Sequence, residues 1–80
     1  MSMTSAFAFI NCHFPFNDAV IKEFCKLPFV SDVYRTGGIY DIIIRVNSLT
    51  EKGVRENIIR NIRSMESVNS TMTMVIAEGK

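Results

Sequence analysis

The sequence predicts a single domain of the α+β class with the element order β-α-β-β-α-β, and three observations support this prediction. Four short segments rich in β-branched and aromatic residues are interspersed with two segments whose apolar residues recur every three or four positions. Prolines, a glycine pair and a helix-capping pattern fall at the borders of these segments. The 80 residues contain no linker or low-complexity tract, so one domain is expected to cover residues 1–80.

The four predicted strands are short and largely apolar. Gly37-Gly38 separates the second strand from the third and makes a hairpin of the two. Polar residues within the second strand suit a position at the edge of a sheet. The strands are expected over residues 5–12, 30–35, 39–47 and 68–77.

The two predicted helices are recognised by their caps and by their apolar stripes. Asn17 is a suitable N-cap for the first helix, and Pro28 ends it because the residue before a proline avoids the α region. Ser48 and Glu51 form a capping box that predicts the start of the second helix. The expected buried positions are Val20, Phe24 and Leu27 in the first helix and Val54, Ile58, Ile62 and Met65 in the second.

Two similar βαβ halves with right-handed crossovers predict a ferredoxin-like sandwich. In this arrangement a four-stranded antiparallel sheet carries both helices on one face, and the first and third strands occupy its centre. Alternation along the third strand places Tyr40 and Ile42 on the helix side, so Tyr40 is expected to be packed. Met72 and Met74 are expected to fill the core.

The face of the sheet without helices is expected to be apolar too. The first strand has apolar residues at both alternating sets of positions, and 48% of the chain is hydrophobic. Such a patch is large for a monomer, and packing it on a second copy removes it from water. The sequence therefore predicts a homodimeric α/β module, with an interface containing Phe7, Phe9, Ile39, Ile43 and Val75.

Composition limits the partners and the location of the protein. No stretch approaches the roughly 20 apolar residues of a membrane span, and the N-terminus has no charged signal-peptide region, so a cytoplasmic location is expected. A net charge of +1 gives no field that would gather nucleic acid. The basic residues of the second helix are interleaved with glutamates and are expected to form a solvated face: Lys52, Arg55, Arg60 and Arg63.

Neither a metal site nor a catalytic site is predicted. Cys12, His13 and Cys25 lack the paired close spacings of four zinc ligands, so packed thiols and an exposed histidine are expected. The single histidine has no acidic partner near it in the sequence, and no nucleophile motif is present. The sequence therefore predicts a protein that is not an enzyme and that uses no cofactor.

The most informative motif is the glycine pair followed by Tyr40-Asp41. Asp41 is a carboxylate at the start of an apolar strand, and such a conflict between residue and pattern often marks function. One interpretation is a tight hairpin whose aspartate binds backbone N–H groups. The other is a site for a zwitterion, in which Asp41 accepts from an ammonium and the uncovered N–H groups of the turn bind a carboxylate.

The chain resembles the effector-binding domain, also called RAM, of the leucine-responsive regulator (Lrp)/AsnC family of transcription factors. The resemblance covers nearly the whole chain. It rests on Val30-x-x-Val33-Tyr34 leading into Thr36-Gly37-x-x-Tyr40-Asp41, and on Val68-x-Ser70-Thr71-x-Thr73 near the end. Full-length members carry a helix-turn-helix domain before this module, and the sequence does not show one. The resemblance therefore implies a stand-alone version, of the kind seen in archaea and bacteria, without direct DNA binding.

The resemblance implies a dimer that assembles further into a tetramer or octamer and binds an amino acid between dimers. The hydroxyls of the last predicted strand could contribute, although threonine is also simply common in strands. The ligand-binding residues expected from the resemblance are Tyr34, Thr36, Gly37, Gly38, Tyr40, Asp41, Ser70, Thr71 and Thr73.

The function expected from these observations is a sensor of an amino acid or related metabolite that modulates a transcription-related assembly. Full-length regulators with the same domain are possible partners. Two alternatives stay open at this point: a small dimeric, cofactor-independent oxygenase of the ferredoxin-like fold, and a purely structural partner of full-length regulators. The absence of tryptophan and the single histidine count against the oxygenase.

Overall fold

The computed structural model describes residues 3–13 and 18–76. It confirms the order β-α-β-β-α-β, with one addition, a short π-helical segment after the second helix. The elements are β1 (Thr4–Cys12), α1 (Asp18–Cys25), β2 (Val30–Arg35), β3 (Ile42–Ser48), α2 (Glu51–Ile58), η1 (Ile59–Arg63) and β4 (Val68–Val75).

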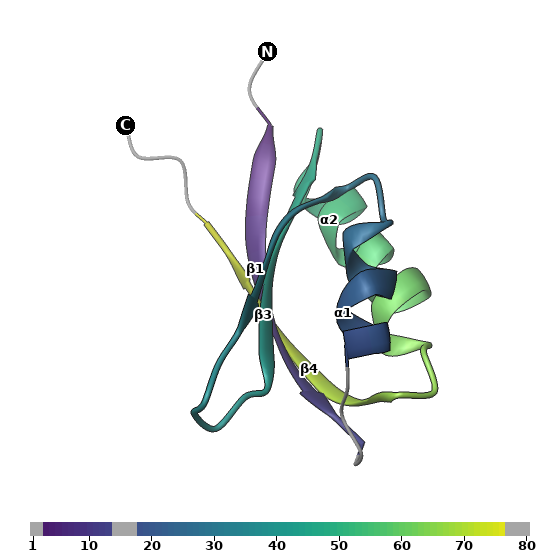
Figure 1. Ribbon diagram of the computed structural model, residues 1–80. Helices are drawn as coiled ribbons and strands as arrows, with labels where there is room; N and C mark the ends of the chain where they lie inside the picture. Colours follow the sequence, from purple (N-terminus) through teal and green to yellow (C-terminus); the bar gives the residue numbers. More distant parts are fainter. Residues whose placement is uncertain (1–2, 14–17, 77–80) are drawn as a thin grey trace.

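The four strands form one antiparallel sheet in the order β2-β3-β1-β4. The predicted centre and edges of the sheet are therefore confirmed. Figure 1 shows both helices on one face of the sheet, while the opposite face carries no helix. None of the described helices is long and apolar enough to cross a bilayer.

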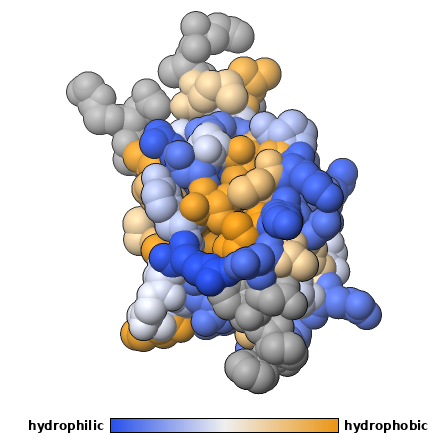
Figure 2. Space-filling view, viewed as in Figure 1, coloured by the Kyte–Doolittle hydropathy of each residue, from blue (hydrophilic) through white to orange (hydrophobic). Residues whose placement is uncertain are grey.

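The core lies between the sheet and the helices. From the side shown in Figure 2, hydrophobic residues gather in the middle of the molecule and hydrophilic residues surround them. The core contains every position predicted for the two helix stripes except Leu27 and Met65, which are partly buried and packed against it. The buried residues are Ala6, Ala8, Ile10, Val20, Phe24, Ile42, Ile44, Val46, Val54, Ile58, Ile62 and Val68.

Several predicted boundaries differ from the structure. The first helix ends at Cys25, two residues before Leu27, and its predicted cap at Asn17 lies outside the described residues. The strand β3 begins at Ile42 rather than at residue 39, so residues 36–41 form a loop. The strand β4 ends at Val75, and residue 77 lies outside the described residues.

A β-bulge reverses the predicted faces of β4. Cys12 pairs with Val68, but Asn11 pairs with Ser70, so Asn69 is the extra residue. An extra residue moves every following side chain to the other face of the sheet. Val75 therefore lies on the helix side, packed against the core, and its predicted place on the bare face is wrong.

The same bulge places Met72 and Met74 on the bare face, where they pair with Phe9 and Phe7 across β1. The prediction that these methionines fill the core is therefore wrong. They are 46% and 53% exposed, whereas the two phenylalanines are half-buried. The bare face is as apolar as predicted, but with a different set of residues on β4.

The second helix begins differently from the prediction. Ser48 is still part of β3, so it cannot cap the helix. The N-cap is Thr50, which has an extended backbone and whose Oγ1 accepts a hydrogen bond of 2.9 Å from the Gly53 N–H. The predicted capping box of Ser48 and Glu51 is therefore wrong, and the helix begins at Glu51, two residues later than a cap at Ser48 would place it.

The cap provides a test of this assignment. Thr50→Ala removes the acceptor of the Gly53 N–H and is expected to lower the free energy of unfolding by about 1 kcal/mol. Ser48→Ala, the control, removes a hydroxyl that makes no cap and is expected to change it by less than about 0.5 kcal/mol. Chemical denaturation measures both. A larger loss for the serine variant would contradict the assignment.

Candidate functional site

The structure places most of the predicted ligand-binding residues in two regions of the subunit, and Tyr34 and Ser70 lie in neither. The first is the loop of residues 36–41 between β2 and β3. The second is a groove between the α2–η1 helix and the edge strand β4, which Thr71 and Thr73 line. We describe the loop first.

Asp41 closes the loop and joins it to β1. Its Oδ2 accepts a hydrogen bond of 2.8 Å from the Cys12 N–H. Its own N–H donates to the Ile10 carbonyl at 2.9 Å, and its carbonyl accepts from the Thr36 N–H at 2.9 Å. A partly buried carboxylate that satisfies a backbone donor explains why an aspartate occurs at the start of an apolar strand. This is the structural interpretation of Asp41, and it leaves Oδ1 available for a second donor.

The side chain of Thr36 makes the loop compact. Its hydroxyl donates to the Tyr40 carbonyl, and its Oγ1 lies 3.4 Å from the Gly38 N–H. These contacts leave fewer uncovered N–H groups in the turn than the sequence suggests. Ile39, at the loop, is 87% exposed, so its predicted place within a strand is wrong.

The glycine pair has no evident steric role within the subunit. A Cβ added at Gly37 or Gly38 would meet no atom within 4 Å, and neither residue has the positive φ that favours glycine. Nothing in the described chain therefore requires glycine here.

The two tyrosines lie on the bare face of the sheet. Tyr34 pairs with Ile43 and is 52% exposed. The Tyr40 ring packs against Phe9, with ring centroids 5.5 Å apart, and its hydroxyl donates weakly to the Met72 sulfur at 3.7 Å. The expectation that Tyr40 packs on the helix side is therefore wrong, because the strand begins only after it and its backbone does not follow the alternation.

The β4 hydroxyls divide between the two faces of the sheet. Ser70 pairs with Asn11 on the bare face, whereas Thr71 and Thr73 lie on the helix side beyond the bulge. The described residues thus bring the two threonines together with the helix, and they do not bring Ser70 or the loop to the same place.

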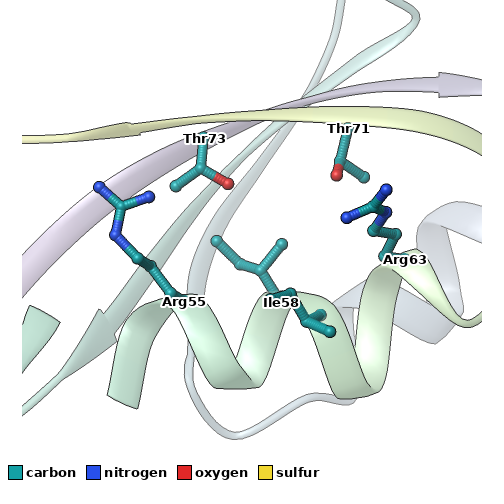
Figure 3. A pocket seen from close by; sticks show the side chains of 6 residues that line it. Arg55, Ile58, Arg63, Thr71 and Thr73 are labelled. Atoms are coloured by element: carbon teal, nitrogen blue, oxygen red, sulfur yellow. The ribbon is translucent and has the colours of Figure 1, made fainter. Parts of the chain in front are cut away.

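The groove has a volume of about 240 Å³. Figure 3 shows Thr71 and Thr73 pointing from β4 toward the helix, Arg55 and Arg63 at the two ends of the groove, and Ile58 between them. Ile59 of η1 completes the lining. The arginines were expected on a solvated helix face, so sequence reasoning missed their role. The spacing of eight residues does not place Arg55 and Arg63 on one side of a regular α-helix, so the sequence contains no signal for this role.

The polar groups of the groove are hydrogen-bond donors with few partners. Arg55 uses its Nε to bind Glu51 at 3.1 Å, which leaves its terminal nitrogens available. Among the described residues, Arg63, Thr71 and Thr73 make no side-chain hydrogen bond. Guanidinium groups and hydroxyls together are suited to binding oxyanions.

The cysteines and the histidine form no site in the described part of the chain. Both thiols are free: Cys12 is half-buried, whereas Cys25 is exposed, contrary to the expectation that it packs. Burial, and the nearby Asp41 charge to a lesser degree, raise the pKa of the Cys12 thiol above its usual value. His13 is exposed, as predicted. No three His, Cys, Asp or Glu side chains gather as metal ligands in residues 3–13 and 18–76.

The fold is that of a small α+β module with a groove at one edge of its sheet. The chain belongs to the Lrp/AsnC family, because the model of the Lrp/AsnC ligand-binding domain matches residues 5–79. The resemblance of its motifs is thereby confirmed. No curated protein sequence matches the chain with statistical significance.

Solved structures agree with this assignment. FFRP-DM1 is 27% identical with a TM-score of 0.87, and the match covers 92% of this chain and 99% of FFRP-DM1. AsnC of E. coli is 22% identical with a TM-score of 0.83, and this chain covers 52% of its length. The regulator NMB0573 from Neisseria meningitidis, solved in complex with L-Met, is 14% identical, with a TM-score of 0.77 and coverage of 94% and 50%. The latter two similarities establish the fold alone.

Asp41 offers a test of its structural role. Asp41→Ala leaves the partly buried Cys12 N–H without an acceptor and is expected to lower the free energy of unfolding by about 1–3 kcal/mol. Asp41→Asn keeps an amide oxygen for that N–H and is expected to cost less than half as much. Thermal and urea unfolding of the three proteins measure the difference. Equal losses for both variants would show that the hydrogen bond to Cys12 is not what stabilises the loop.

Proposed function

We propose that this chain is a cytoplasmic sensor module. It binds an amino acid or a related metabolite at an interface between subunits, and binding modulates an assembly that regulates transcription. The observation that carries the proposal is the match of the Lrp/AsnC ligand-binding domain over residues 5–79. The complex of NMB0573 with L-Met supports an amino acid as the ligand class, because that regulator has the same fold.

The groove between α2–η1 and β4 is the candidate place for the ligand in each subunit. It combines the donors that a carboxylate needs with threonine oxygens that can accept from an ammonium. The exposed loop of residues 36–41 would then contact a neighbouring subunit or its ligand. The open space around Gly37 and Gly38 and the exposure of Ile39 support this role.

The bare face of the sheet supports a homodimer. Its apolar part contains half-buried Phe7, Phe9 and Ile43, with Met72 and Met74 beside them, and Arg45 pairs with Phe7 on the same face. Contiguous apolar surface of this kind marks interfaces, and stable interfaces bury about 800 Å² on each partner. Dimers would assemble further into a tetramer or octamer, and mixed assemblies with full-length regulators are possible through the same face.

A ligand can change such an assembly only through different affinities for its states. A ligand held between dimers would stabilise the larger assembly. A ligand that binds only to an isolated dimer would favour dissociation of the larger assembly into dimers. This is a binding mechanism without chemistry on the ligand.

The groove gives no support to the oxygenase alternative. Its lining contains arginine, isoleucine and threonine, none of which serves as a general base near neutral pH. A purely structural partner differs from a sensor only in its response to ligand, which titration decides.

Titration with the standard amino acids tests the sensor. At about 100 times its Kd, a ligand is expected to raise the free energy of unfolding by about 2.7 kcal/mol. The thermal midpoint should rise with the ligand concentration, and analytical ultracentrifugation should show a change in assembly. If no amino acid changes either quantity, amino-acid sensing is excluded.

A variant of the loop provides the control for this experiment. Gly38→Ala meets no atom in the subunit, so its stability without ligand should stay the same or rise by about 0.4–1 kcal/mol. If the loop approaches a ligand or a neighbouring subunit, the same variant should weaken the response to ligand. An unchanged response would remove the loop from the site.

The dimer is tested by a charge on the bare face. Met74→Glu is expected to separate the subunits, because a carboxylate in an apolar interface loses its hydration. The matched control is Ile59→Glu on η1, since Ile59 is 54% exposed and Met74 is 53% exposed. Sedimentation should give a particle near 9.1 kDa for the first variant and a dimer or larger species for the second. A monomeric parent protein would contradict the proposed interface.

A further inference from the structure

The groove between α2–η1 and β4 has two positive ends and an apolar middle. Arg55 lies near Thr73 at one end, and Arg63 lies near Thr71 at the other (Figure 3). Each end therefore offers one guanidinium and one hydroxyl. Ile58, with neighbouring Ile59, forms the surface between them.

The charge of the lining selects for anions. Both charged residues of the lining are arginines, and the carboxylate paired with Arg55, that of Glu51, lies outside the lining. A cationic side chain placed here would meet two like charges, which lowers its affinity relative to an anion. Arg55 is paired through its Nε with Glu51, but its terminal nitrogens remain available, so an uncharged amino acid would place its one carboxylate at either these nitrogens or Arg63 and leave the other end without a ligand carboxylate.

The π-helical segment explains how one helix places two arginines along one strand. Residues eight positions apart on a regular α-helix differ by roughly 80° around the axis. η1 contains more residues per turn than an α-helix, and this reduces the offset between Arg55 and Arg63. The helix thus directs both side chains at β4, where the bulge has turned Thr71 and Thr73 toward it.

The size of the groove limits the ligand. A volume of about 240 Å³ is the space of about eight water molecules at roughly 30 Å³ each. A ligand of this size that carries an anionic group for each end would have the two groups joined by a short aliphatic spacer. The isoleucine surface between the arginines suits such a spacer.

We infer that the ligand of this groove is a small dicarboxylate, either an acidic amino acid or the corresponding acid without an amine. The inference rests on the proposed function for the placement of the ligand in this groove. It goes beyond that function because the charge of the ligand is inferred from arginines of this chain.

The test compares glutamate, glutarate, glutamine and leucine by isothermal titration and by NMR shifts of the Thr71 and Thr73 amides. Both dicarboxylates are expected to shift these amides, and at least one of them should bind about tenfold or more tightly than the uncharged amino acids. Glutamate binding far more tightly than glutarate identifies an amino-acid sensor. Equal affinities for glutamate and glutarate would confirm a dicarboxylate site. They would also show that the amine is not recognised, which argues against amino-acid sensing.

Variants of two arginines provide the matched comparison. Arg63→Gln should weaken dicarboxylate binding by about tenfold or more, since a charge-assisted hydrogen bond is lost. Arg60→Gln, on the same helix but outside the lining, should change it by less than about twofold. Thr73→Val should weaken binding without unfolding the strand.

Three results would overturn the inference. Leucine or glutamine binding more tightly than both dicarboxylates would leave a sensor with a different ligand class. Equal effects of Arg60→Gln and Arg63→Gln would show general charge attraction rather than a site. Shifts of the loop amides of residues 36–41 without shifts of Thr71 and Thr73 would place the ligand elsewhere.

Discussion

The architecture depends on one constraint. The sheet has apolar side chains on both of its faces, but the helices cover only one of these faces. The central strand β1 shows how the two faces are used. It directs the small residues Ala6 and Ala8 toward the helices, where they are fully buried and let the helices approach closely. It directs Phe7 and Phe9 toward the bare face, where they stay half-buried. Most of the apolar volume of the strand therefore lies on the face that a single subunit cannot cover, which gives association a physical basis independent of family membership.

The order of the elements followed from the sequence because periodicity and breakers agree along most of the chain. Val20 and Phe24 on one helix, and Val54, Ile58 and Ile62 on the other, fall at helical spacing and are buried as expected. The predictions that were wrong each depend on the position of a single residue. The bulge at Asn69 reverses the faces of β4, and no local pattern announces it. Thr50 replaces Ser48 as the cap because β3 continues to Ser48, and the length of that strand is set by its pairing with β1.

The candidate site was predictable only in part. Thr71 and Thr73 were expected from the resemblance to bind ligand, and the structure places them beside a groove but away from the loop of residues 36–41. Arg55 and Arg63 were not identified, because a basic residue on an amphipathic helix usually faces solvent and the sequence does not show which strand lies beside it. Asp41 was identified, but its contact with the Cys12 N–H joins residues 29 positions apart and could not be derived from the local pattern.

The strand β4 connects the two surfaces on which the proposed function depends. Its residues alternate, so Thr71 and Thr73 face the groove while Met72 and Met74 face the bare side of the sheet. An edge strand is held by one neighbour only, and β4 pairs with β1 alone. A ligand that joined the arginines to the threonines would fix the position of β4 relative to the helix. Met72, between the two threonines, and Met74, directly after them, would then be held in one arrangement on the opposite face. In the proposed sensor, this strand is therefore the physical route by which a ligand on one side of the sheet favours one packing of subunits on the other.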